Sequence, residues 1–538
     1  MASTPSLPRS SAASADQAPH AAIRVHAAAS EKSPAAEKPA VENPAGIPVR
    51  TILLGVAGVT LITIGGAGAG AILKTDPLLT DTSLSWIRYG HGHDLATMTL
   101  YVGLGLVIWA WIRLGRMIRN QQVGSLAVLI AIAAWTLPLL LSPPLFSKDI
   151  YSYLAQGQLA LHGFDPYVVG PAALPSPLSD NVSWVWQNTP APYGPLFILL
   201  AKAVVWATNG SVIGGVVVMR LVLALGLALT CWALPGLARH LGGRPAVALW
   251  LGAANPLILV HLIGGAHNDV LMVGLMAAGV LMVLNRRHVL GIALVTLAVA
   301  IKATAGVALP FLVLVWAARL EGTRRARLVR AIARSVGVFV LVFAFCSVIA
   351  RVDLGWISAL RSSSAIVNWL SLPTAVGDFV HSLVDLVVRV DQGWFLGVAR
   401  GLGAVLLLYI AWRQWRAAED GGADAVRRAA ITMLAVALLS PATLPWYFSW
   451  PLVLGAGLAW TTSGLAAAAF FSCVLLLVTF PNGDTALYSG MYLVMTAAVS
   501  ALAAVSLTRP DPLQLSNRYV RPAAAPAPTP EPTSAVAD

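Results

Sequence analysis

Charged residues are scarce in this chain of 538 residues. Asp, Glu, Lys and Arg make up 11% of it, hydrophobic residues make up 57%, and the mean hydropathy is +0.75. A soluble domain carries about 25% charged residues, so the composition excludes a soluble globular protein. Apolar runs of about 15 to 22 residues recur from Thr51 to Leu507, and runs of about this length cross a hydrocarbon core roughly 30 Å thick.

Cysteine is also scarce, and its spacing excludes two classes of site. The three cysteines, Cys231, Cys346 and Cys473, lie singly within apolar segments. They form neither a disulfide framework nor a metal-ligand spacing, and small buried side chains explain them. The formal charge of +12 does not indicate nucleic-acid binding, because the arginines are spread over short loops between apolar runs. Such loops are typical of the cytoplasmic face of a membrane protein.

Both ends of the chain differ from its middle. Residues 1–48 are rich in Ala, Pro and Ser and lack the early apolar core of a signal peptide, and residues 509–538 form a similar Pro/Ala-rich segment. Such compositions are typical of disordered tails. We therefore expect two disordered cytoplasmic tails around one transmembrane domain, residues 49–508.

The apolar runs predict an all-α polytopic membrane protein with about 13–15 transmembrane helices. The expected spans are 51–73, 95–113, 124–142, 215–235, 246–262, 270–285, 289–302, 304–319, 331–350, 395–413, 429–443, 447–461, 464–480 and 489–507. The segments 195–208 and 369–390 are open between spanning, interfacial and re-entrant. Arginine clusters follow only even-numbered spans, which places these clusters and both tails in the cytoplasm. The segment 143–214 is then a long extracytoplasmic loop in a plasma-membrane protein.

Four polar clusters share the expected outer face. The first is Asp149, at the start of an amphipathic stretch with Tyr151 and Tyr153 that a Gly-Phe-Asp-Pro-Tyr turn ends. The others are His267-Asn268-Asp269, Lys302, and Trp446-Tyr447. Ordinary explanations also exist: Ser147, Asp149, Asn268 or Asp269 as a helix cap, Lys302 reaching the interface, and the aromatic residues as an interfacial belt.

Together these side chains fit one chemistry. A carboxylate can accept the proton of an attacking sugar hydroxyl, and a lysine can stabilise the charge of a departing phosphate. Amide, imidazole and aromatic groups suit sugar binding. A donor with a long lipid tail requires a site at the bilayer surface beside an amphipathic helix.

The motifs that carry these residues resemble a known family. The segments "FSKDIYSYLAQGQLALHGFDPY", "APYGPLF", "NPLILVHLIGGAHNDVLM", "IKAT" and "LPWYFSWP" resemble the actinobacterial polyprenyl-phosphomannose-dependent α-1,6-mannosyltransferases of the GT-C superfamily. The resemblance covers about residues 50–507. It implies a GT-C-like fold and inverting transfer of mannose from polyprenyl-phosphomannose to an α-1,6-mannan acceptor of lipomannan or lipoarabinomannan, on the extracytoplasmic side.

The resemblance also assigns roles to residues. Asp149 is expected to be the catalytic base, Lys302 a phosphate contact, and Tyr151, Tyr193 and Tyr447 part of the cavity. The full set of expected substrate-binding residues is Lys148, Tyr151, Tyr153, Asp165, Tyr193, His267, Asn268, Asp269, Lys302, Trp446 and Tyr447. No cofactor or metal ion is expected, because Lys148 and Ile150 flank Asp149 where the family often has two adjacent acids. The expected partners are the lipid-linked donor, a mannosylated glycolipid acceptor and membrane lipids.

Two other functions compete with this prediction. The first is a GT-C transferase for another lipid-linked sugar or acceptor, such as arabinose or a protein. The second is a transporter of lipid-linked oligosaccharide, which would place charged pairs near the middle of the bilayer.

Overall fold

The computed structural model describes residues 46–510 and 512, apart from 75, 77 and 361–365. The expected tails 1–48 and 509–538 therefore lie almost wholly outside the described residues. Within them the chain forms helices and two isolated bridges, and no β-strand. The longer helices are α1 (Val49–Ala69), α2 (Gly90–Arg119), α3 (Ser125–Leu140), α7 (Val212–Leu241), α9 (Asp269–Leu284), α12 (Arg324–Ala350), α15 (Gln392–Ala417), α16 (Gly422–Leu439), α18 (Thr462–Leu477) and α19 (Gly490–Thr508).

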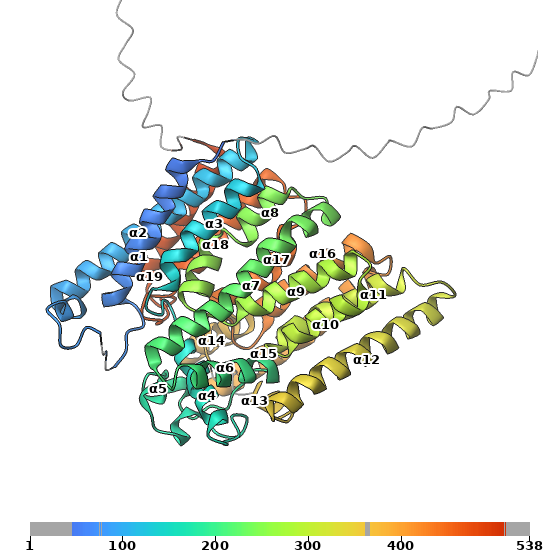
Figure 1. Ribbon diagram of the computed structural model, residues 1–538, viewed down its shortest axis with the longest axis horizontal. Coiled ribbons are helices and arrows are strands. Elements are labelled where there is room, and N and C mark those ends of the chain that lie inside the picture. Colours follow the sequence, from blue (N-terminus) through green and yellow to red (C-terminus); the bar gives the residue numbers. More distant parts are fainter. Residues whose placement is uncertain (1–45, 75, 77, 361–365, 511, 513–538) are drawn as a thin grey trace, which may run out of the picture. The chain divides into compact units, whose positions relative to one another are not determined.

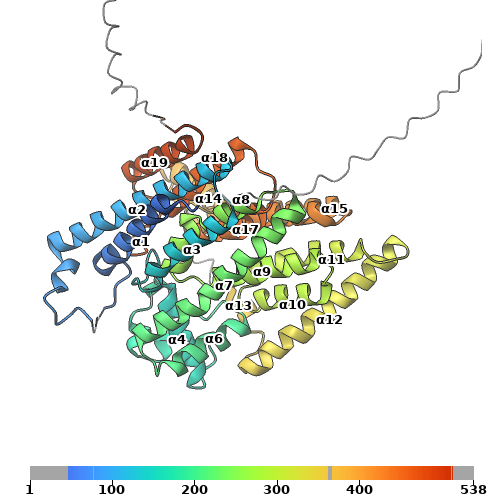
Figure 2. The same ribbon diagram turned by 45° about the horizontal axis from the view of Figure 1, so that its top comes forward.

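Shorter helices complete this framework. They are α4 (Asp149–Leu161), α5 (Pro177–Asp180), α6 (Pro195–Ala207), α8 (Pro245–Gly252), the π-helix η4 (Leu257–Gly264), α10 (His288–Val299), the 3-10 helix η5 (Ala303–Ala308), α11 (Leu309–Ala317), α13 (Trp356–Ala359), α14 (Leu372–Asp385), η7 (Pro445–Phe448) and α17 (Ser449–Ala456). Helix α2 packs on both α1 and α19, and α10, α11 and α12 pack on one another, with α10 also packed on α9 (Figures 1 and 2).

The prediction of an all-α polytopic membrane protein is confirmed. Six described helices are long and apolar enough to cross a membrane, or up to seven if α8 and η4, bent by 49°, form one span. Each expected span coincides with at least one helix. Besides the six long helices, however, six apolar helices have only 10–17 residues, and most of these occupy expected spans. By length and composition the described residues thus contain six or seven candidate spans, against the expected 13–15 transmembrane helices. A helix of 16 residues, such as α9, is only about 24 Å long.

The two ambiguous segments form helices below spanning length. The first, 195–208, becomes α6, which has 13 residues and packs on α4. The second, 369–390, contains α14, which has 14 residues and packs on α15. If neither crosses the membrane, the alternation of arginine clusters along the chain is kept.

Arginines at the loops hold helix ends together. Arg319 donates to the carbonyl oxygens of Val283 and Leu284, where α9 ends. Arg119 donates to Leu507 O, near the end of α19, at 2.6 Å. Carbonyl groups in the last turn of a helix lack partners within the helix, so the arginines satisfy them as well as supplying positive charge. These contacts join helix ends at loops that the arginine pattern predicts to share one face.

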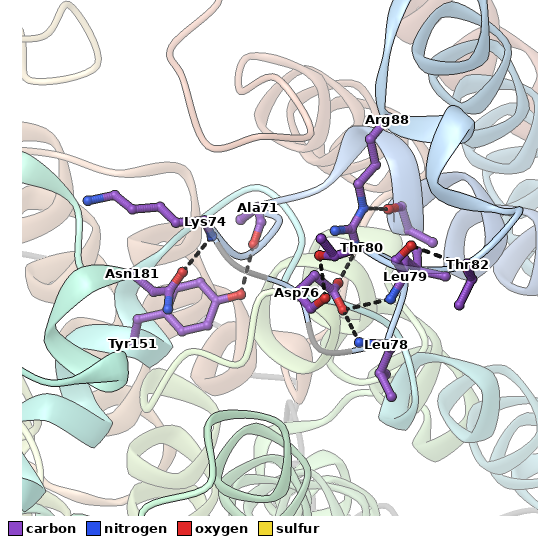
Figure 3. Close-up of polar contacts among 11 residues, drawn as sticks. Ala71, Lys74, Asp76, Leu78, Leu79, Thr80, Thr82, Arg88, Tyr151 and Asn181 are labelled. Carbon is purple, nitrogen blue, oxygen red and sulfur yellow. Dashed lines mark hydrogen bonds and ion pairs between the residues drawn. The ribbon is translucent and has the colours of Figure 1, made fainter.

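The loop after α1 is fixed to the segment around α4. Tyr151 Oη donates to Ala71 O at 2.8 Å, and the backbone N–H of Lys74 donates to Asn181 Oδ1 at 2.8 Å (Figure 3). Figure 3 also shows Asp76 paired with Arg88 in this loop. The loops 70–89 and 142–194, which the arginine pattern predicts on one face, are therefore in direct contact.

Asp76 provides a pH-dependent contribution to this loop. Burial raises the pKa of Asp76, but the Arg88 guanidinium and the backbone N–H groups of Leu78 and Leu79 outweigh burial, so its pKa lies below the ordinary value. A lowered carboxyl pKa stabilises the folded state above the unfolded pKa of about 4, and this stabilisation is lost as the pH falls through the folded pKa.

We expect Asp76→Asn to lower the midpoint of thermal unfolding in detergent at neutral pH. The difference from wild type should shrink as the pH falls below about 4, because protonation removes the same ion pair. Asp81→Asn, at an exposed position of the same loop, is the control and should have no effect. A difference that does not change with pH would contradict the role of the Asp76 charge.

Candidate active site

Asp149 is the first residue of α4, and its carboxylate does not cap the helix. The backbone N–H of Asp149 donates to Ser147 Oγ at 3.1 Å, so Ser147 supplies the side-chain contact at this helix end. The side chain of Asp149 is 17% exposed and faces a cavity. The N-cap residue of α4 is Lys148, and no side chain caps the helix. Of the two explanations that the sequence leaves open, a capping role therefore does not describe the Asp149 carboxylate.

His267 lies beside this carboxylate. His267 Nδ1 is 3.5 Å from Asp149 Oδ2, and the imidazole stacks on the indole of Trp446 with ring centroids 3.7 Å apart. The imidazole is fully buried, and neither ring nitrogen makes a hydrogen bond within the described protein. A separation of 3.5 Å is long for a hydrogen bond, so a small movement would allow His267 to bind and orient Asp149.

Asp269 and Lys302 form a buried ion pair next to this cluster. Lys302 Nζ lies 2.9 Å from both carboxylate oxygens of Asp269, and Trp450 Nε1 donates to Asp269 Oδ1 at 2.6 Å. Asp269 is fully buried. An unpaired charge in this environment would cost several kcal/mol, so removal of either partner would be strongly destabilising.

Aromatic rings enclose the Lys302 ammonium. Its nitrogen lies 4.6 Å from the ring centroid of Tyr447 and 5.4 Å from that of Trp450, within the range of cation–π attraction. The side chain is only 14% exposed. The ammonium of Lys302 is therefore held by Asp269 and the two rings, and the alternative of a lysine that extends into water does not describe its position.

Asp149 and Lys302 line the same cavity, which has a volume of about 550 Å³. Ser152 and Gln156 of α4 share the face of Asp149, and Tyr193, Trp446, Tyr447 and Trp450 add aromatic surface. The remaining lining comes from Trp186, Thr189, Pro190, Pro192, Ala303, Thr304, Leu360, Ile366, Ser440, Pro441, Ala442 and Leu444. The cavity thus has a carboxylate, a cation, uncharged polar groups and stacking surfaces, a combination that suits a phosphorylated sugar.

A close backbone contact fixes two walls of the cavity. Gly194 N donates to Ile301 O at 3.1 Å, and Leu196 N donates to Ala300 O at 2.9 Å. A Cβ atom at Gly194 would lie 2.4 Å from Ala300 O, so only glycine permits this approach. The Pro-Tyr-Gly-Pro motif therefore docks on the residues directly before Lys302, and Tyr193 lines the same cavity as Lys302.

Two strained residues precede the reactive groups. Phe146 and Ala266 adopt positive φ values of 60° and 56°, which L-residues other than Gly, Asn and Asp rarely adopt. Phe146 lies three residues before Asp149, and Ala266 directly precedes His267. Such strain persists only where the surroundings enforce the conformation, and it is found here on both sides of the contact between Asp149 and His267.

The other expected site residues lie outside the lining. Lys148 is exposed, and Asp165 is exposed and accepts a hydrogen bond from Tyr167 N within its turn. Tyr151 contacts Ala71, because it lies about 200° around α4 from Asp149. Tyr153 is buried behind the cavity against Tyr193 and Phe197. His267, Asn268 and Asp269 are fully buried and form the layer behind the lining.

Two family models match most of the membrane domain. Residues 52–318 match the model described as the N-terminal domain of alpha-(1->6)-mannopyranosyltransferase, and residues 373–509 match the MptB C-terminal domain. Alpha-(1->6)-mannopyranosyltransferase A of Mycobacterium tuberculosis is 44% identical over 477 residues, which is 87% of this chain and 91% of that protein. The chain belongs to the alpha-(1->6)-mannopyranosyltransferase family.

A second relative supports the assignment. Alpha-(1->6)-mannopyranosyltransferase A of Corynebacterium glutamicum is 31% identical over 471 residues, covering 83% of this chain and 96% of that protein. No solved structure matches the chain. The expectation of a membrane mannosyltransferase is confirmed, and the comparisons give no support to the alternative of a transporter.

Some lining residues of this mannosyltransferase were not among the expected site residues. Ser152, Gln156 and Thr304 line the cavity, and Ser152 Oγ, Gln156 Oε1 and Thr304 Oγ1 are buried without a hydrogen-bond partner in the described protein. The sequence does contain a signal for the first two: residues 149, 152 and 156 have the spacing of one helical face.

Arg220, in the middle of α7, is also absent from the expected set. It is fully buried, and its guanidinium donates to four backbone carbonyl oxygens at 2.6–3.0 Å. Those oxygens belong to Leu140 and Ser142 at the end of α3 and to Ile263 and Gly264 at the end of η4. A lone arginine within an apolar span is the signal that marks it, the same signal that selects Lys302. Arg220 joins the segment that leads into Asp149 to the segment that leads into His267.

We expect Arg220→Met to lower the thermal stability of the mannosyltransferase, by about 3 kcal/mol, because four buried carbonyl groups lose their donor. Arg220→Lys, which keeps the charge but not the planar group, should have an intermediate effect. Arg239→Met, at an exposed position in the last turn of α7, is the control. Thermal unfolding in detergent measures the order, and equal stability of the Met variant and wild type would contradict this role.

Proposed function

We propose that the enzyme transfers mannose from polyprenyl-phosphomannose to the 6-hydroxyl of an α-1,6-linked mannan acceptor, with inversion at the anomeric carbon. One observation carries the proposal: a carboxylate without a capping role and a lysine line the same cavity of about 550 Å³. The relatives' names specify the alpha-(1->6) mannopyranosyl product. The acceptor would then be a growing glycolipid of the lipomannan or lipoarabinomannan type.

Asp149 is the proposed general base. The acceptor oxygen attacks C1 of the donor mannose, the bond between C1 and the phosphate oxygen breaks, and the hydroxyl proton passes to the Asp149 carboxylate. Positioned general bases accelerate such steps by about 10²–10⁴-fold. His267, 3.5 Å away and held by the stack on Trp446, orients the carboxylate.

Lys302 is the proposed contact for the departing polyprenyl phosphate. Asp269 holds the ammonium at 2.9 Å, and the side chain still lines the cavity. A preorganised cation stabilises negative charge that develops on the leaving group, and exclusion of water strengthens this effect. Tyr193, Trp446 and Tyr447 provide the rings on which the sugar faces can stack.

The donor set of the cavity supports chemistry without a metal ion. Asp149 is the one carboxylate in its lining, and both oxygens of Asp269 are bound by Lys302 while one also accepts from Trp450. No cluster of three His, Cys, Asp or Glu side chains suited to a metal ion lies in the described part of the chain. We propose that Lys302 takes the place that a divalent ion has in nucleotide-sugar chemistry.

We propose that the cavity faces the extracytoplasmic side of the plasma membrane. Support comes from the arginine clusters, which follow even-numbered expected spans, whereas the segments around 149, 193, 267 and 302 follow odd-numbered ones. In this orientation both tails are cytoplasmic, and the lipid-linked donor reaches the cavity from the outer leaflet.

The proposed reaction is tested with purified enzyme, mannosyl-phosphoryl-polyprenol and a short α-1,6-mannoside acceptor. We expect elongation by α-1,6-linked mannose, established by linkage analysis of the product. Transfer of arabinose from its lipid-linked donor under the same conditions, without transfer of mannose, would contradict the donor assignment.

We expect Asp149→Asn to fold normally and to lose about 10²–10⁴-fold of the transfer rate, because an amide cannot accept the hydroxyl proton. Asp165→Asn is the matched control: Asp165 is exposed in the same loop and away from the cavity. The rate should be measured at saturating donor, with thermal unfolding as the folding check. A wild-type rate for Asp149→Asn would rule out its role as base.

A further inference from the structure

A second cavity, of about 760 Å³, lies where α11 and α15 end and α12 begins. Four arginines line it, Arg324, Arg325, Arg327 and Arg416, together with Glu419 and Asp420. Arg324 and Arg416 pair with Glu419 at 2.5 and 3.7 Å. Arg325 and Arg327 form no ion pair with any described carboxylate, and Arg327 Nε is buried without a hydrogen-bond partner. The cavity therefore has an excess of positive charge.

Three of these arginines, Arg324, Arg325 and Arg327, lie on α12, and their position there adds to the positive potential. They occupy the first turns of the helix, where the backbone N–H groups already present a positive potential. No acidic residue lies in the first turn of α12, and the one side-chain cap is Thr323, which accepts from Ala326 N. An anion in the cavity would be attracted by both the guanidinium groups and the helix end.

An apolar groove continues from the basic cavity along the same helices. The groove, of about 440 Å³, is lined by Gly306, Leu309, Pro310, Val313, Ile332, Ser335, Val336, Phe339 and Trp415. Trp415 lines both spaces, and its indole N–H donates to Pro310 O at 3.3 Å. Tryptophan with its ring in apolar surroundings and its N–H at a polar group is typical of the boundary between lipid headgroups and hydrocarbon.

The groove opens toward the expected lipid phase. The apolar windows of α12 and α15 are only 17% and 11% buried, and α12 lies at the edge of the helix group in both views (Figures 1 and 2). Val336, in the groove, is 53% exposed. The basic cavity shares no lining residue with the candidate active site. It lies at the start of α12, which has 27 residues and is about 40 Å long.

We propose that this cavity and groove bind an anionic phospholipid, with its phosphate at Arg325 and Arg327 and one acyl chain along α11, α12 and α15. Charge complementarity selects the headgroup, since basic pockets between membrane helices bind anionic lipids. The adjoining apolar groove selects a lipid over a soluble anion. The basic cavity shares no lining residue with the proposed donor cavity, so lipid binding and mannosyl transfer can fail independently.

The test is native mass spectrometry of the full-length protein in detergent, with phosphatidylglycerol and phosphatidylcholine in competition. We expect wild type to retain phosphatidylglycerol preferentially. The double variant Arg325→Gln/Arg327→Gln should bind phosphatidylglycerol at least about tenfold more weakly than wild type, because each basic residue contributes severalfold to such binding. Arg413→Gln/Arg427→Gln is the control, since it removes the same charge from exposed positions of α15 and α16 outside the cavity.

A groove variant keeps the test independent of the arginines. Val336→Trp fills the groove from an exposed position and should weaken retention of phosphatidylglycerol while leaving mannosyl transfer unchanged. Absence of lipid preference in wild type, equal loss in the control, or displacement of the lipid by inorganic phosphate alone would each overturn the proposal. Cross-linking of the cavity to the amino-terminal segment 1–45 in place of lipid would overturn it too.

Discussion

The structure depends on how Arg220 satisfies the backbone at the ends of α3 and η4. Inside a membrane domain, carbonyl groups at a helix end have no water to bind, and irregular backbone persists only where protein groups satisfy it. The Arg220 guanidinium donates to four such carbonyl oxygens. This contact lets two helices stop short of full spanning length, and the segments that follow them carry Asp149 and His267. The segments that carry Asp149 and His267 thus begin at the helix ends that Arg220 binds.

The charges of the site follow from the same constraint. Asp269 is fully buried, and its ionised form is matched by Lys302 and Trp450. Tyr447 and Trp450 enclose the ammonium, so the cation is fixed before any substrate enters. Asp149 differs from Asp269 because no lysine or arginine pairs with it, and its neighbour is the imidazole of His267 at 3.5 Å. The two carboxylates therefore suit different roles, one as a structural counter-ion and the other as a base.

The sequence predicts the helical class, the positions of the apolar segments and the family. It also predicts that Asp149, Tyr193, Lys302, Trp446 and Tyr447 belong together, and the structure places all five on one cavity. It predicts less about direction around a helix: Tyr151 is close to Asp149 in sequence, yet it faces Ala71. The sequence also predicts helix length poorly, because an apolar run does not show at which residue the helix ends. Arg220 and the pair of Asp269 and Lys302 depend on contacts between distant segments, which one sequence does not reveal.

The most direct test of this account is a structure of the enzyme with a non-hydrolysable mannosyl-phosphonate analogue of the lipid-linked donor. The phosphonate should lie within hydrogen-bond distance of Lys302 Nζ, and the mannose should lie between Tyr193 and Trp446. Asp149 should then lie where it can reach an acceptor hydroxyl on the far side of C1. A donor bound with its sugar outside this cavity, or with its phosphonate away from Lys302, would contradict the account.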